Sequence, residues 1–294
     1  MQEKIGNSEN KKLVPHEITS IGICKQWIFY MQKGYLPWNT LNVNEAWYAR
    51  ILEALAVDFA SVNELRKLIG ENPVATRRIV LQHDENFLIK LAEILTAYSQ
   101  KELPSAIEAV MRLISSQVSP AVNRIVLKRK IWQDVLRLAA IKKLSGNTDL
   151  LSEINMSTTV TKQKEKDNKE TKQENEIDEE GIFVQHAGLV LVHPFLPSLF
   201  KRLELITEGK FIDTPSQQKA ICLLHSIVTG TTAAQEYELV VPKILCEWPL
   251  QMPVERDSEL SKDELNEADN MLQAVIEQWT VLKNTSVEGL REGF

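Results

Sequence analysis

The stretch SKDELNEADNMLQAVIEQW, residues 261–279, carries the clearest periodic pattern in the chain. Its apolar residues recur every three or four positions, which places them on one face of an α-helix. Ser261 and Glu264 form a capping box, in which each side chain accepts a hydrogen bond from a backbone N–H of the first turn. The pattern predicts a helix with the apolar stripe Leu265, Ala268, Leu272, Val275, Ile276 and Trp279.

A polar segment of quite different composition lies upstream. Residues 152–180, SEINMSTTVTKQKEKDNKETKQENEIDEE, hold almost no apolar side chains and mix Lys with Glu and Asp. Such a segment does not bury enough apolar surface to offset its ordering entropy. An exposed single helix is the alternative, against which the Thr and Asn content and the missing stripe argue. We therefore expect a disordered N-terminus at 1–14, a helical domain at 15–150, a disordered charged linker at 151–180 and a second helical domain at 181–294.

The part of the chain before this linker shows helical spacing throughout and predicts six or seven helices and no strand. The first helix is expected to end where Gly34 and then Pro37 interrupt its stripe. Later helix starts are indicated where Ser or Asn is followed three positions on by Glu. These capping boxes pair Asn42 with Glu45, Ser61 with Glu64, and Ser105 with Glu108. One further stripe comprises Phe87, Leu88, Leu91, Ile94, Leu95 and Tyr98.

The part after the linker is also predicted to be helical, with more interruptions. Pro215 indicates the start of a helix that Gly230 closes. Thr232 and Gln235 suggest another capping box. The pentapeptide YELVV is the only candidate strand, and Pro242 after it argues against a strand. The predicted fold class is all-α, with two compact multi-helix domains joined by a charged disordered linker.

Composition and charge limit the classes of partner. The 294 residues carry 40 acidic against 34 basic side chains, so the net charge of −6 gives no general attraction to nucleic acid or to an anionic membrane. No apolar run reaches the ~20 residues that span a bilayer, and the first residues lack the apolar core of a signal peptide. We expect a soluble protein made in the cytoplasm, whose partners are proteins, with no membrane and no small-molecule substrate.

A few residues suggest metal binding, which the spacing does not favour. His186 and His193 lie seven apart, Cys222 and His225 form C-x-x-H, and Cys246 is a further soft ligand. Metal ligands on one helix normally lie three or four apart, and a glycine and a proline interrupt the segment between the first two histidines. We interpret both of these histidines as structural, and we expect no metal and no cofactor. The three cysteines of the chain are expected to remain reduced thiols.

Catalytic patterns are equally weak. Ser216 and Lys219 match S-x-x-K, but the partner motifs S-D-N and K-T-G are absent from the sequence. The acidic pairs Glu236/Glu238 and Asp263/Glu264 have no neighbouring histidine in sequence, and we interpret them as solvated faces and helix N-terminal charge. No catalytic residue is predicted, and we expect that the protein is not an enzyme.

Four apolar side chains next to prolines are candidate anchors for other proteins. Trp38 follows Pro37, Trp248 precedes Pro249, and Phe195 and Leu196 lie between Pro194 and Pro197. A proline-flanked turn is rigid, so an aromatic side chain on it loses little entropy on docking. The alternative, which is more common, is that such a side chain closes the core of its own domain. The candidate interaction residues are Trp38, Phe195, Leu196 and Trp248.

Five sequence blocks, in this order and spacing, resemble the contractile injection system tape measure protein family. They are WIFYMQKGYLPWN (27–39), QHAGLVLVHPFLPSLFKRLELI (185–206), QQKAICLLHSIVTG (217–230), EYELVVPKILCEWPLQMPV (236–254) and AVIEQWTVLKNTSVEGLREGF (274–294). Members of this family tend to be longer, with additional segments before and after these blocks. We therefore expect a short member or a fragment.

The resemblance implies a structural component of a phage-tail-like particle that sets or initiates the length of its inner tube. It implies no reaction and no cofactor, and its implied partners are tube, baseplate or sheath proteins. The alternative is a cytosolic assembly factor or chaperone-like adaptor of the same particle. The many prolines and short helices indicate compact modules rather than one extended ruler.

Overall fold

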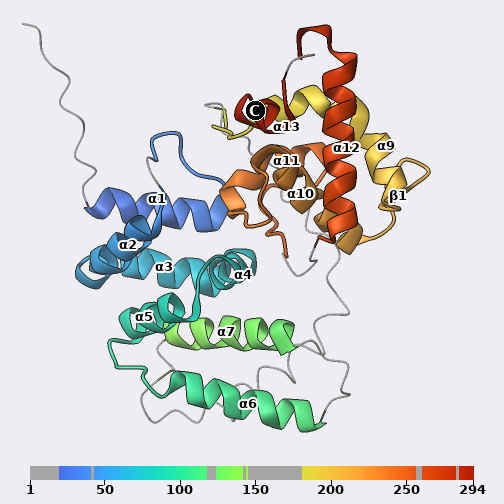
Figure 1. The fold of residues 1–294 in the computed structure, drawn as a ribbon. Coiled ribbons are helices and arrows are strands. Elements are labelled where there is room, and N and C mark those ends of the chain that lie inside the picture. The colour runs from blue at the N-terminus through green and yellow to red at the C-terminus, as the bar shows by residue number, and fades with distance from the viewer. Residues whose placement is uncertain are drawn as a thin grey trace, which may run out of the picture.

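The computed structural model describes residues 20–40, 43–117, 124–141, 144, 181–255, 260–282 and 285–294. The predicted disordered segments 1–14 and 151–180 lie outside the described residues. Two groups of helices, each around its own apolar core, form the molecule (Figure 1). The prediction of an all-α fold is confirmed, because the described strands are limited to one two-residue pair.

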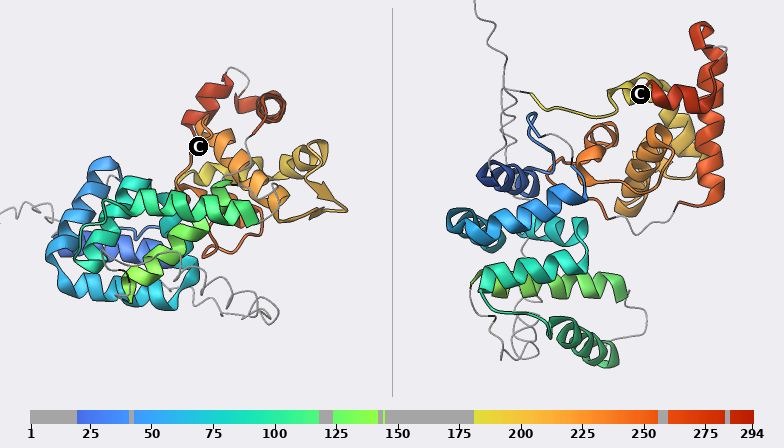
Figure 2. Two further views of the ribbon diagram at one scale, coloured as in Figure 1. Left: turned by 90° about the horizontal axis from the view of Figure 1, so that it is seen from below. Right: turned by 60° about the vertical axis from the view of Figure 1, so that its left-hand side comes forward.

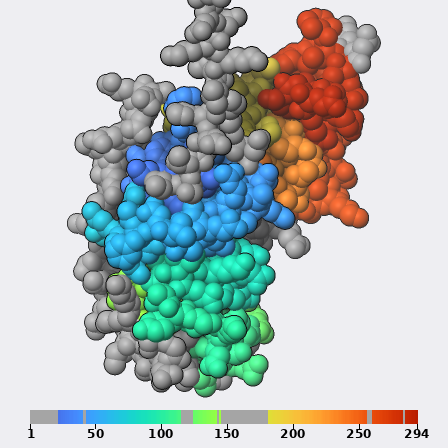
Figure 3. All heavy atoms as spheres, turned by 90° about the vertical axis from the view of Figure 1, so that its left-hand side faces the viewer, coloured from blue at the N-terminus to red at the C-terminus, as the bar shows by residue number. Residues whose placement is uncertain are grey.

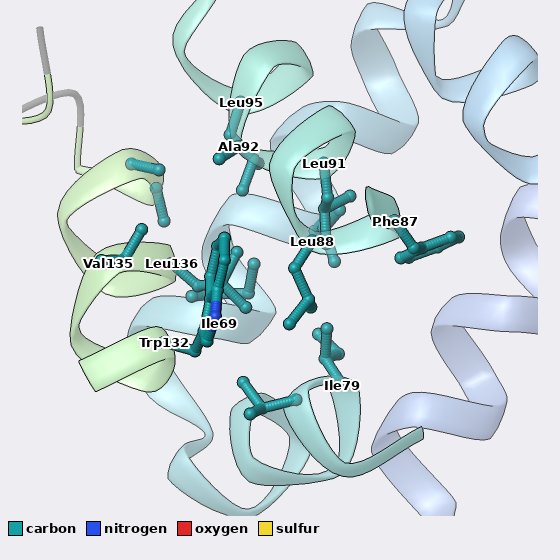
Figure 4. Packing of buried hydrophobic residues seen from close by; sticks show 14 of the residues in the cluster. Ile69, Ile79, Phe87, Leu88, Leu91, Ala92, Leu95, Trp132, Val135 and Leu136 are labelled. Atoms are coloured by element: carbon teal, nitrogen blue, oxygen red, sulfur yellow. The ribbon is translucent and has the colours of Figure 1, made fainter. Parts of the chain in front are cut away.

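The first group, which we call the N-terminal unit, stacks its helices in successive layers from α1 to α6 (Figures 1 and 2). Apolar side chains from α3, α5 and α7 meet in its interior, among them Ile69 of α3, Leu91 of α5 and Trp132 of α7 (Figure 4). Its helices are α1 (Ser20–Lys33), α2 (Glu45–Val57), α3 (Phe59–Glu71), α4 (Pro73–Gln82), α5 (Glu85–Thr96), α6 (Leu103–Gln117) and α7 (Arg124–Ala140).

Three predicted helix starts in this unit are wrong. The cap of α2 is Asn44, whose Oδ1 accepts from the backbone N–H of Trp47 at 2.9 Å. Asp58 caps α3, and the hydroxyl of Ser61 in the first turn donates to the Asp58 carboxylate at 2.5 Å. Helix α6 starts at Leu103, so Ser105 already lies inside it. For α2 and α3 the actual cap is another polar residue within a turn of the predicted one, and sequence spacing alone does not rank such candidates.

The second group, the C-terminal unit, packs around α10, ten of whose sixteen residues are buried. Asp213 caps this helix, and Gly230 ends it in the left-handed conformation, as predicted. The Ser261–Glu264 capping box of α12 is confirmed as well. Its helices are η1 (Ala187–Phe195), α9 (Leu196–Arg202), α10 (Thr214–Thr229), η2 (Glu236–Leu239), α11 (Val240–Leu245), α12 (Lys262–Gln278), η3 (Thr280–Leu282) and α13 (Val287–Glu292).

Two local predictions for this unit need correction. Gln235, predicted as the third helical residue after a Thr232 cap, is itself the cap of η2 and forms a box with Glu238. A hairpin that the sequence did not indicate joins β1 (Ile206–Thr207) to β2 (Lys210–Phe211) in antiparallel register. The YELVV segment forms η2 and the start of α11, so its rejection as a strand is confirmed.

Candidate functional site: the junction between the two helical units

The two units meet where the C-terminal end of α1 and helix α4 face η2, α11 and the turn that follows α11 (Figure 1). Helix α1 ends at Lys33. Gly34 adopts φ 89°, and its N–H donates a hydrogen bond to the Tyr30 carbonyl. A Cβ placed on Gly34 would stand 2.5 Å from the Leu250 carbonyl oxygen. The turn after α1 therefore lies in direct backbone contact with the turn after α11.

The buried side chain of Arg78 in α4 forms hydrogen bonds with both units at this contact. Its guanidinium donates to the carbonyls of Met31 and Gln251, one from each unit. The side chain is 0% exposed, and burial lowers the pKa of its guanidinium while the nearby Glu236 carboxylate raises it. Arginine keeps its charge under these conditions. Arg78 thus supplies charge-assisted donors to carbonyl groups of both units at this contact.

The countercharge comes from the C-terminal unit. Glu236 of η2 is also 0% exposed, and its Oε1 lies 4.0 Å from Arg78 Nε and in contact with Lys243 Nζ. Lys243 of α11 donates further to the carbonyls of Leu250 at 3.1 Å and Met252 at 2.9 Å. Two cations and one carboxylate are therefore held together by backbone carbonyls, away from water.

A neutral contact extends this cluster. The side-chain oxygen of Gln82 in α4 accepts from the Glu236 backbone N–H at 3.1 Å and from the Tyr30 hydroxyl at 3.3 Å. The ring of Tyr30 meets the ring of Tyr237 edge to face, with centroids 5.8 Å apart. Burial raises the pKa of Tyr237 to about 12. Because the site is closed to solvent, it acts as a clamp between the units and not as a substrate pocket.

The sequence pattern did not indicate this cluster, and it suggested the wrong environment for one of its members. Glu236 and Glu238 were interpreted as a solvated face, which is wrong: Glu236 is fully buried, and Glu238 Oε2 lies 3.3 Å from His225 Nε2. One signal was present, since Lys243 lies in the apolar run VVPKIL. A lysine surrounded by apolar residues on every side of a short helix has no solvated face to occupy.

The structure brings two of the four predicted anchors to this junction and separates the other two from it. Trp38 follows the Gly34 turn and is 74% exposed. Trp248 lies in the adjoining turn but is half-buried, and its indole N–H donates to the Met252 carbonyl at 2.9 Å. Phe195 is half-buried against the C-terminal core, and Leu196 is buried inside it. Of the four, Trp38 is the side chain most available to another protein.

The two histidines that we interpreted as structural lie elsewhere in the C-terminal unit. His193 is exposed, whereas His186 immediately precedes η1 and its ring lies 6.2 Å from that of the buried His225. Burial and the neighbouring His225 lower the pKa of His186, and Glu238 opposes them. Among the described residues, no group of three His, Cys, Asp or Glu side chains is placed to hold a metal ion.

The family model described as contractile injection system tape measure protein matches residues 7–294. The chain belongs to this family. It is therefore a structural component of a contractile injection system, a tape measure that sets or initiates the length of the inner tube. No curated protein and no solved structure matches the chain.

Two of the sequence blocks that resemble this tape measure family contribute to the junction, and they meet there with Arg78 and Gln82 of α4, which lie outside the blocks. The upstream block 27–39 supplies Tyr30, Met31 and Gly34, and block 236–254 supplies Glu236 and Lys243. The first and last C-terminal blocks also meet, because a Cβ on Gly188 would stand 2.9 Å from Phe294 Cα. The motifs of the tape measure protein thus describe contacts within the chain.

Proposed function

We propose that this tape measure protein acts as a compact rigid module that docks onto tube, baseplate or sheath proteins, rather than as an extended rod. The observation that carries the proposal is the buried Arg78–Glu236–Lys243 cluster, which ties the two units together. Among the described helices the longest have 17 residues, or about 26 Å at 1.5 Å per residue. Short helices clamped into one body suit a docking part better than a continuous ruler.

Trp38 is the anchor that we assign to this docking. Its side chain stands in solvent next to a turn fixed by the Gly34 backbone and the Arg78 side chain. An exposed tryptophan on an ordered turn brings a large contact area with little further loss of entropy. Trp248, Phe195 and Leu196 are secondary candidates, because each already packs within the C-terminal unit.

We further infer that the docking involves no reaction and no cofactor, and that it takes place in the cytoplasm. The lysine of the S-x-x-K pattern, Lys219, is paired with Glu264 at 2.8 Å, so it is not positioned as a free base for Ser216. None of the described helices is both long and apolar enough to cross a membrane. The role is then carried by protein packing alone.

Trp38→Ala tests the anchor, with Val281→Ala as a control because Val281 is 93% exposed on the C-terminal unit. We expect both variants to fold as judged by circular dichroism, and only Trp38→Ala to change the number or length of particles seen by electron microscopy. Normal particles from Trp38→Ala would remove this anchor. Deletion of the whole gene tests the role: tubes that are missing or of uncontrolled length support a tape measure, and aggregated tube subunits indicate an assembly factor instead.

A further inference from the structure

A second exposed apolar feature lies on the N-terminal unit, away from the junction. Helices α2, α3 and α5 and the turn after α5 line an open groove of about 950 Å³. Its floor includes Leu55 and Val62, which belong to the apolar core of the unit. Figure 3 faces the side of the molecule on which these helices lie next to one another. The groove thus opens directly onto the core.

Three large apolar side chains along the groove stand in solvent. Val57, Phe59 and Tyr98 are 83%, 69% and 61% exposed, respectively. A small molecule is usually enclosed on most of its surface, which walls this open do not provide. Exposed apolar side chains gathered at one groove are instead typical of a binding site for another protein.

These side chains are held at two fixed corners of the backbone. Asp58 lies between Val57 and Phe59, ends α2 and caps α3, and accepts from the Ala60 N–H at 3.1 Å. At the other corner Ala97 adopts φ 61°, and the Tyr98 N–H donates to Thr96 Oγ1 at 3.3 Å. A left-handed alanine carries backbone strain, which other interactions must offset. The aromatic rings are therefore presented in advance of any binding.

The charges of the groove indicate what kind of chain would fill it. Arg66 and Glu93 are already engaged, Arg66 with the Leu95 carbonyl and Glu93 with the Gln100 N–H. Glu53 on α2 and Lys90 on α5 are exposed and make no ion pair within the described part of the chain. An apolar floor with one free acid on one wall and one free base on the other matches an amphipathic helix whose stripe is flanked by opposite charges.

We propose that the groove binds an amphipathic helix from another protein of the injection particle. Its apolar residues, spaced three, four and seven apart, would contact Phe59 and Tyr98, with a basic residue facing Glu53 and an acidic one facing Lys90. A second copy of this chain is a poorer match, because α5, α6 and α12 bury their apolar stripes in its own two cores. This inference rests on the proposed docking function but concerns a different surface from Trp38.

Photo-crosslinking in cells that assemble the particle tests the occupant. Benzoylphenylalanine replaces Phe59 or Tyr98 in the full chain, and replaces Val281 as a control, and crosslinked peptides are identified by mass spectrometry. We expect Phe59 and Tyr98 to reach one helical peptide of another particle protein, and Val281 not to reach it. Crosslinks from the groove to this same chain or to a second, isotope-labelled copy, to a peptide without the apolar spacing, or to nothing would overturn the proposal.

Charge reversal tests the orientation. With benzoylphenylalanine at Tyr98, Glu53→Lys and Lys90→Glu should each lower the crosslink yield roughly two- to fivefold, the scale of an exposed ion pair. Phe59→Ala should lower it roughly tenfold or more. Glu64→Lys and Lys67→Glu, on the exposed side of α3 outside the groove, are the matched controls and should leave the yield unchanged. Equal losses in the controls would contradict the proposal.

The same cells separate this inference from the proposed function. If gene deletion changes tube length while the groove crosslinks find no partner helix, the groove proposal fails and the tape measure role stands. If Trp38→Ala leaves the particles normal while Phe59 and Tyr98 reach one helix, the groove is the docking surface and Trp38 is not.

Discussion

Gly34 lies directly against Leu250: a Cβ on Gly34 would come within 2.5 Å of the Leu250 carbonyl oxygen and 2.9 Å of the Arg78 guanidinium. The two residues belong to different units, so this contact leaves no room for a side chain where the units meet. Glycine is needed at this position for a second reason as well, because φ is 89°, a left-handed conformation that other residues rarely adopt.

We therefore expect Gly34→Ala to lower the free energy of unfolding by at least about 2 kcal/mol, from the left-handed strain and the displaced turn. Gly209→Ala separates the two causes, because Gly209 also has positive φ but nothing within 4 Å of its Cβ position. It should cost only about 1–2 kcal/mol. Urea unfolding followed by circular dichroism measures both, and equal losses would show that the Leu250 contact is unimportant.

Adjacent arginines of α4 provide a second test. Arg78→Ala removes the buried donor of the Met31 and Gln251 carbonyls and one of the two cations next to Glu236, and we expect a loss of about 3–5 kcal/mol. Arg77→Ala is the matched control, because Arg77 pairs with Glu255 at a site where both side chains are about one-third exposed. Its loss should stay below about 1 kcal/mol. A large effect of Arg77→Ala would place the critical ion pair at the surface.

The sequence was most informative where structure is decided locally. Helix α12 followed from its stripe and its Ser261–Glu264 box, and α10 from the residues at its two ends, because each signal lies within a few residues of its effect. The stripe of α5 was predicted too far, since Tyr98 lies past the left-handed Ala97 and is exposed. Nothing in the sequence spacing indicates that alanine adopts this conformation.

The junction could not be predicted for a physical reason. A buried arginine is tolerated only when carbonyl groups and a carboxylate surround it, and those of Arg78 come from α1, η2 and the turn after α11. In sequence, Arg77 and Arg78 look equivalent, yet one pairs at the surface and the other is enclosed. Trp38 and Trp248 likewise each have a proline as a neighbour in sequence. Only the indole N–H of Trp248, however, donates a hydrogen bond to a nearby carbonyl, that of Met252.

The two tryptophans should differ in their contribution to stability. Trp248→Ala removes half-buried packing against the C-terminal core and the bond to the Met252 carbonyl, so we expect a loss of about 2–4 kcal/mol. Trp38→Ala should change stability by less than about 0.5 kcal/mol, because the side chain is exposed. Thermal unfolding of the two purified variants distinguishes them. A destabilised Trp38→Ala would mean that this ring also packs within the chain.

The three cysteines should report on unfolding. Cys24, Cys222 and Cys246 are buried free thiols, and burial raises the pKa of Cys24 to about 11 and raises that of Cys246 as well. The thiolate is the reactive form, so at pH 8 we expect native alkylation to be roughly a hundredfold slower than in urea. Mass spectrometry after iodoacetamide treatment counts the modified sites. Rapid modification of Cys24 without denaturant would show that the α1 contact opens in solution.

Acid should destabilise the N-terminal unit through His83. Its Nδ1 contacts the Ile79 carbonyl at 2.8 Å and its Nε2 accepts from the Trp27 indole N–H at 3.2 Å, so the ring is held neutral with the proton on Nδ1. It also stacks on Phe87 with centroids 3.9 Å apart. Burial lowers the pKa of His83 to about 4 from the usual 6.5.

The folded state disfavours the charged His83 ring. This residue therefore does not reduce the stability of the protein above pH 6.5, and the free energy of unfolding falls as the pH drops from 6.5 towards 4. The loss at the lower end is up to about 3 kcal/mol, since each pKa unit corresponds to about 1.4 kcal/mol. Urea midpoints measured between pH 4 and 8 should show this slope in the wild type. His83→Phe, which keeps the stacking and removes the titration, should flatten it at the expense of some stability at pH 7. The control His193→Gln, at an exposed histidine, should retain the slope. If the slope instead survives in His83→Phe and disappears in His193→Gln, the acid sensitivity belongs to the C-terminal unit.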